Sequence, residues 1–420
     1  MAQFIIEGKQ KLQGDVFVGG MKNAATPILA ATLLTDETCV VSNVPRIVDV
    51  FKMLELLEGL GASVQWTDEH TVSICCKGVD PQKIIASTVR KLRSSVLLIG
   101  PLLARFREIE VPHPGGCIIG NRPMDVHLDA MRALGADVEE GRATIHFQRG
   151  DRLKGAAIVL SEFSVTATEN VLLAAVTAQG TTTIHIAAAE PHVQDLARFL
   201  VKMGARIDGI GTHVLTIHGE EQLHGARHEL IPDQIEIGTW AVVAAVTRGK
   251  IAIHNINPDH LHLLLLKFRQ AGVTSTIDGS ILTIQPTHRI RAFRVQTLPY
   301  PGFPTDLQAP FAVLATQAEG TSLIHDPMYE GRLGYVQELI KMGANAVICD
   351  PHRVLITGPT PLYGQDITSF DLRAGATLIV AALIAQGTTT IREAQIVDRG
   401  YEAIDERLRS LGAHITRKDE

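Results

Sequence analysis

Residues 179–205 read QGTTTIHIAAAEPHVQDLARFLVKMGA, and they contain most of a unit that recurs along the chain. Gly180 can adopt the left-handed conformation that closes the last turn of a helix, so residues 172–179 are predicted to form a helix that ends there. The β-branched run 181–186 predicts a strand. Each unit is therefore expected to place a helix directly before a strand.

A second, amphipathic helix is predicted after the turn at Glu190-Pro191. Its apolar side chains recur at i, i+3, i+4, i+7 and i+8, the spacing of a helix face that packs on a core: Val193, Leu196, Ala197, Leu200 and Val201. Gly204 ends this helix, and residues 214–217 predict further strand. One unit thus contains helices and strands in mixed order.

Six glycines that end such helices are spaced evenly along the chain. Consecutive members lie 68–74 residues apart: Gly61, Gly135, Gly204, Gly272, Gly343 and Gly412. A second set of glycines precedes four of them by 23–25 residues: Gly180, Gly249, Gly320 and Gly387. This period exceeds that of simple solenoid repeats, so each unit is predicted to be a small α/β subdomain.

The six units form two groups of three, with a natural break near Ile231-Pro232-Asp233. Residues 1–9 predict a first strand, which is free to pair into either half. The predicted fold class is α/β, with two domains that each contain three similar subdomains.

Composition excludes several classes of protein. The 420 residues are 45% hydrophobic and 20% charged, so the chain can bury a large core. A net charge of −6 argues against a general binder of nucleic acid or of anionic membranes. The amino terminus lacks a signal-peptide pattern, and the uncharged run 374–385 is too short for a membrane span and predicts a buried helix. Five cysteines without disulfide or zinc spacing favour a reducing compartment, the cytoplasm.

The sequence lacks the common signatures of nucleotide and metal chemistry. Gly249-Lys250 is followed by Ile251, so it is not a P-loop. His-Glu-x-x-His, Cys-x-x-Cys and Gly-x-Ser-x-Gly motifs are absent. Functional residues are therefore sought in polar segments that stand where an ordinary fold has short turns.

Two such segments lie in the first half. The stretch 19–25 passes from a strand to a helix, so backbone amides and Lys22 can face an anion together. Residues 114–127 place glycines on both sides of Cys117, and a thiol in such a loop is expected to be exposed. The other four cysteines stand in strand-like apolar runs, and we expect them to be small core residues.

The second half supplies a carboxylate and several arginines. Asp306 follows a proline and precedes an apolar helix, a position that by itself is typical of a helix cap. Arg332, Arg373 and Arg399 stand beside glycine or at strand ends, and Arg93 is predicted to lie on a helix. Each alone is typical of a surface charge, but together they are suited to clamp carboxylate and phosphate groups.

Taken together, these motifs resemble the enolpyruvyl transferases over residues 11–413. The resemblance is carried by six segments: Lys22-Asn23, Gly115-Gly116-Cys117, Arg122-Pro123-Met124-Asp125, Phe303-Pro304-Thr305-Asp306, Asp371-Leu372-Arg373 and Asp398-Arg399-Gly400-Tyr401. It implies two inside-out α/β barrel domains of three similar subdomains each, which agrees with the six units. Residues 22–231 are expected to form the first domain, and residues 1–21 with 232–420 the second.

The resemblance implies transfer of the enolpyruvyl group of phosphoenolpyruvate to the 3-hydroxyl of UDP-N-acetylglucosamine, the first committed step of peptidoglycan synthesis. It casts Cys117 as the general acid, which also forms a covalent adduct with phosphoenolpyruvate, and Asp306 as the base. The residues expected to bind phosphoenolpyruvate are Lys22, Asn23, Arg122, Arg332, Arg373 and Arg399. Those expected to bind the UDP-sugar are Asn23, Arg93, Arg122, Pro123, Met124, Asp125, Val126, Glu162, Phe163, Ser164, Val165, Asp306 and Met328.

The resemblance implies no metal and no cofactor, because fixed cationic side chains neutralise the phosphate. Glu162 and Gln234 depart from the family pattern, in which basic residues are usual at these positions. Two other functions stay open: a transferase of the same fold with another acceptor, such as shikimate 3-phosphate, and a catalytically idle UDP-sugar-binding regulator. The expected partners are small-molecule substrates, with no nucleic acid and no membrane, and the oligomeric state is open.

Overall fold

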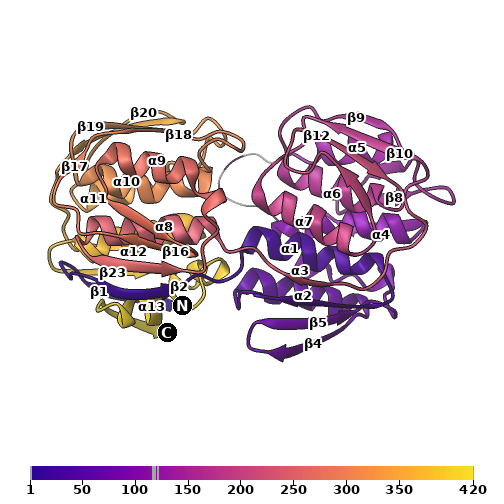
Figure 1. The fold of residues 1–420 in the computed structure, drawn as a ribbon, viewed down its shortest axis with the longest axis horizontal. Helices are drawn as coiled ribbons and strands as arrows, with labels where there is room; N and C mark the ends of the chain where they lie inside the picture. The colour runs from indigo at the N-terminus through magenta and orange to yellow at the C-terminus, as the bar shows by residue number, and fades with distance from the viewer. Residues whose placement is uncertain (1, 116–119, 121–122, 420) are drawn as a thin grey trace. The chain divides into compact units, whose positions relative to one another are not determined.

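The computed structural model describes residues 2–115, 120 and 123–419, and it divides the chain into two compact units (Figure 1). Among the described residues, the Lys22 unit comprises residues 20–115 and 123–231, and the Asp306 unit comprises residues 2–19, 120 and 232–419. The chain passes between the units at Gly19-Gly20 and at Ile231-Pro232.

The Lys22 unit contains three sheets. Their strand orders are β13-β3-β5-β4, β6-β8-β7 and β11-β12-β10-β9. The strands are β3 (Thr38–Ser42), β4 (Ser63–Asp68), β5 (Thr71–Cys75), β6 (Glu108–Pro112), β7 (Asp137–Glu140), β8 (Thr144–Gln148), β9 (Ala157–Val159), β10 (Thr181–His185), β11 (Arg206–Asp208), β12 (Val214–His218) and β13 (Arg227–Glu229). The helices are α1 (Lys22–Ala31), α2 (Val48–Leu60), α3 (Ala86–Val89), α4 (Ile99–Arg105), α5 (Asp125–Ala133), α6 (Val165–Ala175) and α7 (Pro191–Lys202), with 3₁₀ turns η1 (Thr32–Leu34), η2 (Pro81–Lys83) and η3 (Arg93–Leu98).

The Asp306 unit also contains three sheets, with orders β22-β23-β1-β24, β15-β16-β14-β2 and β17-β19-β21-β20, where β18 also pairs with β19. The strands are β1 (Ala2–Glu7), β2 (Gln13–Phe17), β14 (Lys250–His254), β15 (Ser275–Asp278), β16 (Ile281–Ile284), β17 (Ile290–Arg291), β18 (Arg294–Gln296), β19 (Ala318–His325), β20 (Asn345–Asp350), β21 (Arg353–Gly358), β22 (Asp366–Thr368), β23 (Thr388–Arg392) and β24 (His414–Asp419). The helices are α8 (Gln234–Val246), α9 (His262–Ala271), α10 (Gln308–Thr316), α11 (Tyr335–Lys341), α12 (Leu372–Ile384) and α13 (Ile404–Ser410), with 3₁₀ turns η4 (Pro258–His260), η5 (Thr305–Leu307) and η6 (Ala394–Arg399).

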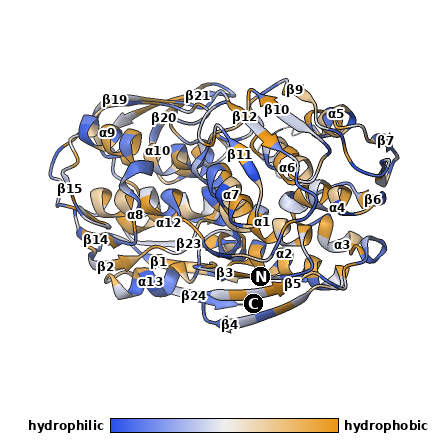
Figure 2. Ribbon diagram, turned by 45° about the vertical axis from the view of Figure 1, so that its right-hand side comes forward, coloured by the Kyte–Doolittle hydropathy of each residue, from blue (hydrophilic) through white to orange (hydrophobic). Residues whose placement is uncertain are grey.

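Buried helices such as α6 and α8 form the interior of each unit, and the sheets lie outside them (Figure 1). In the Asp306 unit, α8, α10 and α12 contact one another, and every residue of α8 and α10 is buried. Their alanine-rich sequences allow close packing on all sides, since a helix that is apolar all round must be buried. In Figure 2 the buried helix α6 is mostly hydrophobic, whereas α13 is mostly hydrophilic. This arrangement confirms the α/β fold of six similar subdomains.

The recurring unit is confirmed except at the end of its first helix. Strand β10, helix α7 and strand β12 occupy the predicted stretches. The prediction that a helix runs to Gln179 was wrong, because α6 ends at Ala175. The Arg152 guanidinium binds the carbonyl of Thr177, and the Gln179 amide donates to the carbonyl of Leu153. These bonds hold the segment in turns that the local sequence does not encode.

All six helix-ending glycines have the left-handed conformation that their position requires, with φ between +83° and +105°. Of the second set, Gly180, Gly320 and Gly387 also have positive φ. At the fourth position the left-handed residue is Arg248, with φ of 53°. Gly249 is required there for a different reason, because a Cβ would lie 1.9 Å from the carbonyl oxygen of Leu12.

The sequence also makes predictions about the first strand, the apolar run after residue 374 and the cysteines. The first strand, β1, pairs with β23 and β24 and so belongs to the Asp306 unit. The apolar run after residue 374 is confirmed as a buried helix, α12. The prediction of core cysteines holds for Cys39 and Cys76 but is wrong for Cys349, which is exposed because β20 is the edge strand of its sheet and has no buried residue. Among the described residues, no helix has the length and apolar composition needed to cross a bilayer.

Gly135→Ala is expected to lower the free energy of unfolding by about 1 kcal/mol, because an L-residue is strained at its φ of 86°. Nothing lies within 4 Å of the added Cβ, so the cost comes from the backbone alone. Urea denaturation measures the change. Gly150→Ala is the matched control, because that position is also open and is not left-handed, and an equal loss in both variants would contradict the explanation.

Candidate functional site

Lys22 stands at the first position of α1, where the sequence predicts an anion-binding turn. No side chain caps this end of the helix, whose dipole favours negative charge. The Lys22 ammonium lies 2.9 Å from a carboxylate oxygen of Asp49, a residue of the first turn of α2 that is only 2% exposed. Asn23, the next residue, is half-buried. Sequence reasoning missed Asp49, because the pairing depends on how α1 and α2 pack.

The glycine before this helix allows two backbone segments to meet. A Cβ on Gly20 would lie 1.8 Å from the carbonyl oxygen of Asn43 and 3.1 Å from Cβ of Leu230. Only glycine therefore fits, and the start of α1 is fixed against the segment that leaves β13.

Several residues predicted to bind the UDP-sugar also lie in the Lys22 unit. Arg93 begins η3, and its Nη2 approaches Sδ of Met124 at 3.9 Å, so the structure brings these two together. Asp125 and Val126 begin α5, with Asp125 exposed and Val126 buried. Pro123 is exposed immediately before them.

The segment 162–165 forms the entry to α6. Ser164 caps the helix by accepting a hydrogen bond from the amide of Ala167, and Val165 is the first helical residue. Glu162 and Phe163 are exposed, and the Phe163 ring packs edge-on against His213 at a centroid distance of 4.9 Å. The Phe163 ring is therefore held in place although it is exposed. The second departure from the family pattern, Gln234, is buried at the start of α8.

Cys117 and Arg122 lie outside the described residues. Their predicted roles as proton donor and as phosphoenolpyruvate ligand therefore remain predictions from the sequence.

Asp306 lies at the centre of a cluster of buried charges in the Asp306 unit. Its Oδ1 is 2.5 Å from Nη2 of Arg332, and its Oδ2 is 3.0 Å from Nη2 and 3.1 Å from Nε of Arg373. The two guanidinium groups come from the segment before α11 and from the first turn of α12. Three parts of the chain therefore converge on one carboxylate.

The expectation that Asp306 caps a helix was wrong. Asp306 lies inside η5, whose N-cap is Pro304 and has no side-chain hydrogen bond. The carboxylate points to the two guanidinium groups instead, because two buried cations offer stronger hydrogen bonds than a backbone amide. The structure brings Arg332 and Arg373 together at Asp306.

Burial and charge act in opposite directions on these arginines. Burial alone would lower the pKa of Arg332, but the charge of Asp306, with smaller help from Asp371, raises it overall. Burial likewise lowers the pKa of Arg373, but its interactions with Asp306, Tyr401 and Asp233 together outweigh burial and raise the pKa overall. Both side chains are therefore permanently charged. In the described part of the chain, Nε of Arg332 and Nη1 of Arg373 are buried donors without a hydrogen-bond acceptor.

Neighbouring side chains hold this cluster in place. Gln308 donates to the carbonyl of Arg332 and accepts a hydrogen bond from the hydroxyl of Tyr335. The Arg373 guanidinium lies over the ring of Tyr401, whose hydroxyl is 2.9 Å from that of Thr239. Burial raises the pKa of Tyr401, so this phenol stays neutral. Tyr401 was part of a motif quoted from the sequence, whereas Gln308 carried no signal because it looks like an ordinary helix residue.

The remaining predicted residues of this unit have ordinary local settings. Arg399 is half-buried at the end of η6, and Asp398 beside it forms two hydrogen bonds, of 2.9 and 2.8 Å, with Arg417 of β24. Met328 is half-buried, and its amide donates to the Asp326 carboxylate at 3.0 Å. These hydrogen bonds therefore hold the backbone in place next to Arg399 and at Met328.

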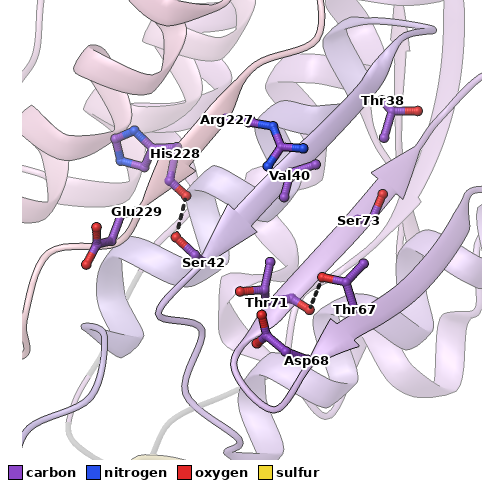
Figure 3. A pocket seen from close by; sticks show the side chains of 10 residues that line it. All are labelled: Thr38, Val40, Ser42, Thr67, Asp68, Thr71, Ser73, Arg227, His228 and Glu229. Atoms are coloured by element: carbon purple, nitrogen blue, oxygen red, sulfur yellow. Dashed lines mark hydrogen bonds between the residues drawn. The ribbon is translucent and has the colours of Figure 1, made fainter.

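A groove of about 730 Å³ lies on the outer face of the sheet that contains β3, β5 and β13 (Figure 3). Hydroxyl side chains such as Ser42 and Ser73 line it, together with Arg227. It contains none of the residues that the sequence predicts to be functional. Residues 2–115, 120 and 123–419 also contain no group of three side chains suited to hold a metal ion.

Glu169, on α6, is a buried carboxyl group that the predicted site does not use. Burial, and secondly the charge of Glu190, raise its pKa well above 4.5, so the folded protein holds it protonated. Its contribution to stability is thus present at low pH and is lost as the pH rises, because the unfolded chain ionises freely. Glu169→Gln should therefore raise the thermal midpoint more at pH 8 than at pH 5.

Thermal denaturation at the two pH values tests this expectation. Glu139→Gln, which alters an exposed carboxylate on β7 of the same unit, should leave the midpoint unchanged at both. An equal effect of Glu169→Gln at pH 5 and pH 8 would show that the carboxyl is not held protonated.

Comparisons with known proteins cover nearly the whole chain. The sequence profile of the family described as EPSP synthase (3-phosphoshikimate 1-carboxyvinyltransferase) matches residues 6–408. A UDP-N-acetylglucosamine 1-carboxyvinyltransferase from Koribacter versatilis is 43% identical over 420 residues, which are 99% of this chain and 96% of the relative. A protein of the same name from Coxiella burnetii is 43% identical over 418 residues, again 99% and 96% of the two chains.

Two solved structures have the same fold. The enolpyruvyl transferase NikO from Streptomyces tendae superposes with a TM-score of 0.90 at 26% identity, and the match covers 99% of each chain. The EPSP synthase from Acinetobacter baumannii gives a TM-score of 0.76 at 20% identity over all of both chains, a likeness that concerns the fold alone.

Proposed function

This chain belongs to the EPSP synthase family of enolpyruvyl transferases, and we propose that it transfers the enolpyruvyl group of phosphoenolpyruvate to the 3-hydroxyl of UDP-N-acetylglucosamine, with release of phosphate. The observation that carries the choice of acceptor is 43% identity, over 99% of the chain, to relatives named for this reaction. The product places the enzyme at the first committed step of peptidoglycan synthesis, and we place it in the cytoplasm.

The reaction needs an acid and a base. Addition joins the sugar oxygen to C2 of phosphoenolpyruvate while a proton is delivered to its methylene carbon, which gives a tetrahedral intermediate. Elimination then removes a proton from the new methyl group and expels phosphate, so no redox partner is required. Cys117 serves as the acid, since a thiol with a pKa of about 8.5 is mainly protonated near neutral pH.

Asp306 serves as the base that accepts the proton of the sugar hydroxyl. The cations of Arg332 and Arg373 stabilise its ionised form, which is the form that a base requires. The same negative charge stabilises cationic character that develops at C2.

Cationic side chains bind the anionic donor substrate. Phosphoenolpyruvate carries a phosphate and a carboxylate, and the unsatisfied donors Nε of Arg332 and Nη1 of Arg373 are suited to such groups. Lys22, at the uncapped start of α1, supplies a further charge, and Arg399 and Arg122 complete the set. Because these charges are fixed, the reaction requires no metal ion.

The acceptor is bound by the exposed or half-buried residues at the starts of helices in the Lys22 unit. Arg93 faces the diphosphate, and Ser164 and Val165 present the entry of α6 to the nucleotide sugar. Glu162 is exposed beside them, so its charge can remain in water rather than oppose the diphosphate. Both alternatives, a shikimate 3-phosphate acceptor and an idle regulator, are disfavoured by identity to relatives named for the UDP-sugar reaction.

Phosphate release with phosphoenolpyruvate and UDP-N-acetylglucosamine tests the proposal. We expect release that depends on both substrates, and no release when shikimate 3-phosphate replaces the UDP-sugar. Release with phosphoenolpyruvate and shikimate 3-phosphate, but not with phosphoenolpyruvate and the UDP-sugar, would identify shikimate 3-phosphate as the acceptor. Binding of the UDP-sugar without any release would identify a regulator.

A further inference from the structure

Three side chains of the Lys22 unit form a chain of hydrogen bonds, from a buried carboxylate to an exposed ammonium, that the proposed reaction does not use. Nε2 of His228 lies 3.0 Å from Oδ1 of Asp195, and Nδ1 of the same ring lies 3.1 Å from Nζ of Lys202. The side chains of His228 and Asp195 are only 4% and 3% exposed. We call these three residues the Asp195 network.

The local sequence explains how the imidazole is enclosed. Asp195, Phe199 and Lys202 lie at i, i+4 and i+7 on one face of α7. Because side chains of β13 alternate, Arg227 and Glu229 are exposed in the outer groove of Figure 3. His228 borders the same groove, where its carbonyl accepts a hydrogen bond from Ser42, but its ring is directed to Asp195 of α7. The Phe199 ring covers the imidazole at a centroid distance of 5.4 Å.

The partners fix the proton positions of the network. An ammonium group only donates, so Nδ1 of His228 accepts from Lys202 and the ring proton lies on Nε2, directed at Asp195. The buried carboxylate is thereby connected through a neutral ring to a positive charge at the surface. A buried carboxylate is costly unless it is paired in this way.

The second oxygen of the carboxylate reaches the backbone that leaves the unit. Oδ2 of Asp195 accepts a hydrogen bond from the amide of Ile231 at 3.3 Å, and Ile231 is the last residue before the chain passes into the Asp306 unit. The carbonyl of Ile231 accepts a bond of 2.8 Å from the amide of Met21. Met21 is the N-cap residue of α1 and directly precedes Lys22.

We propose that Asp195, held by His228 and Lys202, is a positioning residue that fixes Met21 through Ile231 and so places the Lys22 ammonium for the phosphate of the donor substrate. The identity of that substrate rests on the proposed function, whereas the placement of Lys22 does not. The network acts on the phosphoenolpyruvate end of the reaction and not on the nucleotide end.

Asp195→Asn in the full chain tests the proposal, because the amide cannot accept from both the His228 ring and the Ile231 amide. Lys22 is 16% exposed and ion-paired, so it should react slowly with an acylating reagent, whereas Lys341 is 58% exposed and serves as an internal reference. In the variant, mass spectrometry should show faster labelling of Lys22 relative to Lys341. The KM for phosphoenolpyruvate should rise about tenfold, the effect of losing one hydrogen bond to a charged group, while the KM for UDP-N-acetylglucosamine stays unchanged.

Two further variants separate positioning from general loss of stability. Leu196→Ala, a buried residue of α7 outside the network, should lower the thermal midpoint without changing Lys22 labelling or either KM. His228→Gln keeps a donor for Asp195 and should stay close to the original protein, whereas His228→Leu should resemble Asp195→Asn.

Unchanged Lys22 labelling in both Asp195→Asn and His228→Leu would overturn the proposal, and so would an equal change in Leu196→Ala. If the original protein releases no phosphate, the proposed function fails. The labelling result then still decides whether Asp195 places Lys22.

Discussion

Asp306→Asn is expected to lower the rate of phosphate release by about two to four orders of magnitude, the usual effect of removing a general base. Asparagine preserves the shape of the side chain but cannot accept the proton of the sugar hydroxyl. The change also leaves the buried guanidinium groups of Arg332 and Arg373 without their shared counter-charge. A lower thermal midpoint should therefore accompany the loss of rate, since an unpaired buried charge is strongly unfavourable.

A matched variant separates these two effects. Asp405 is a buried carboxylate of the same unit that pairs with Arg409 at 3.0 Å, away from the Asp306 cluster. Asp405→Asn should lower the thermal midpoint and leave the rate of phosphate release unchanged. Equal rate losses in Asp306→Asn and Asp405→Asn would remove Asp306 from its role as base.

Cys117→Ser is expected to lower turnover by about two to four orders of magnitude, because a serine hydroxyl is a far weaker acid than a thiol. Cys117→Asp should keep measurable turnover, since a carboxyl group can donate a proton. The same variant should no longer be alkylated by the epoxide fosfomycin, because it lacks the reactive sulfur. Phosphate release measures the first two effects, and the mass of the intact protein measures the third.

Cys349 provides the control for this thiol, because it is exposed on β20. Cys349→Ser should retain full turnover and should still gain the mass of one fosfomycin molecule. Turnover near the original level in Cys117→Ser, or an adduct on Cys117→Asp, would assign the acid or the alkylation to another residue.

The sequence predicts the fold well because the determinants are local and repeated. A glycine such as Gly204 must end a helix wherever the chain turns left-handed, so six even intervals reveal six units before any contact is known. The end of α6 could not be predicted in this way. It depends on Arg152, whose guanidinium binds a carbonyl 25 residues further along the chain.

The candidate site is only partly predictable from the sequence, because its contacts also join residues that are distant along the chain. Asp306, Arg332 and Arg373 could be named as unusual polar residues, but their ion pairs join segments up to 67 residues apart. Asp49 and Asp195 carried no signal, because a carboxylate in a helix is ordinary until its buried partner is known. Packing, which no local pattern encodes, therefore decides which charges act together.

The position of β1 between β23 and β24 has a consequence for biosynthesis. Residues 2–7 leave the ribosome before residues 8–387, yet their hydrogen-bond partners, residues 388–392 and 414–419, are translated only after that stretch. In the Lys22 unit, the described strands pair only with one another, between residues 38 and 229. This unit can therefore fold while translation continues, since domains generally fold as units. A nascent chain thus carries β1 unpaired until residue 388 has been translated, and termination before that point leaves the strand open to aggregation.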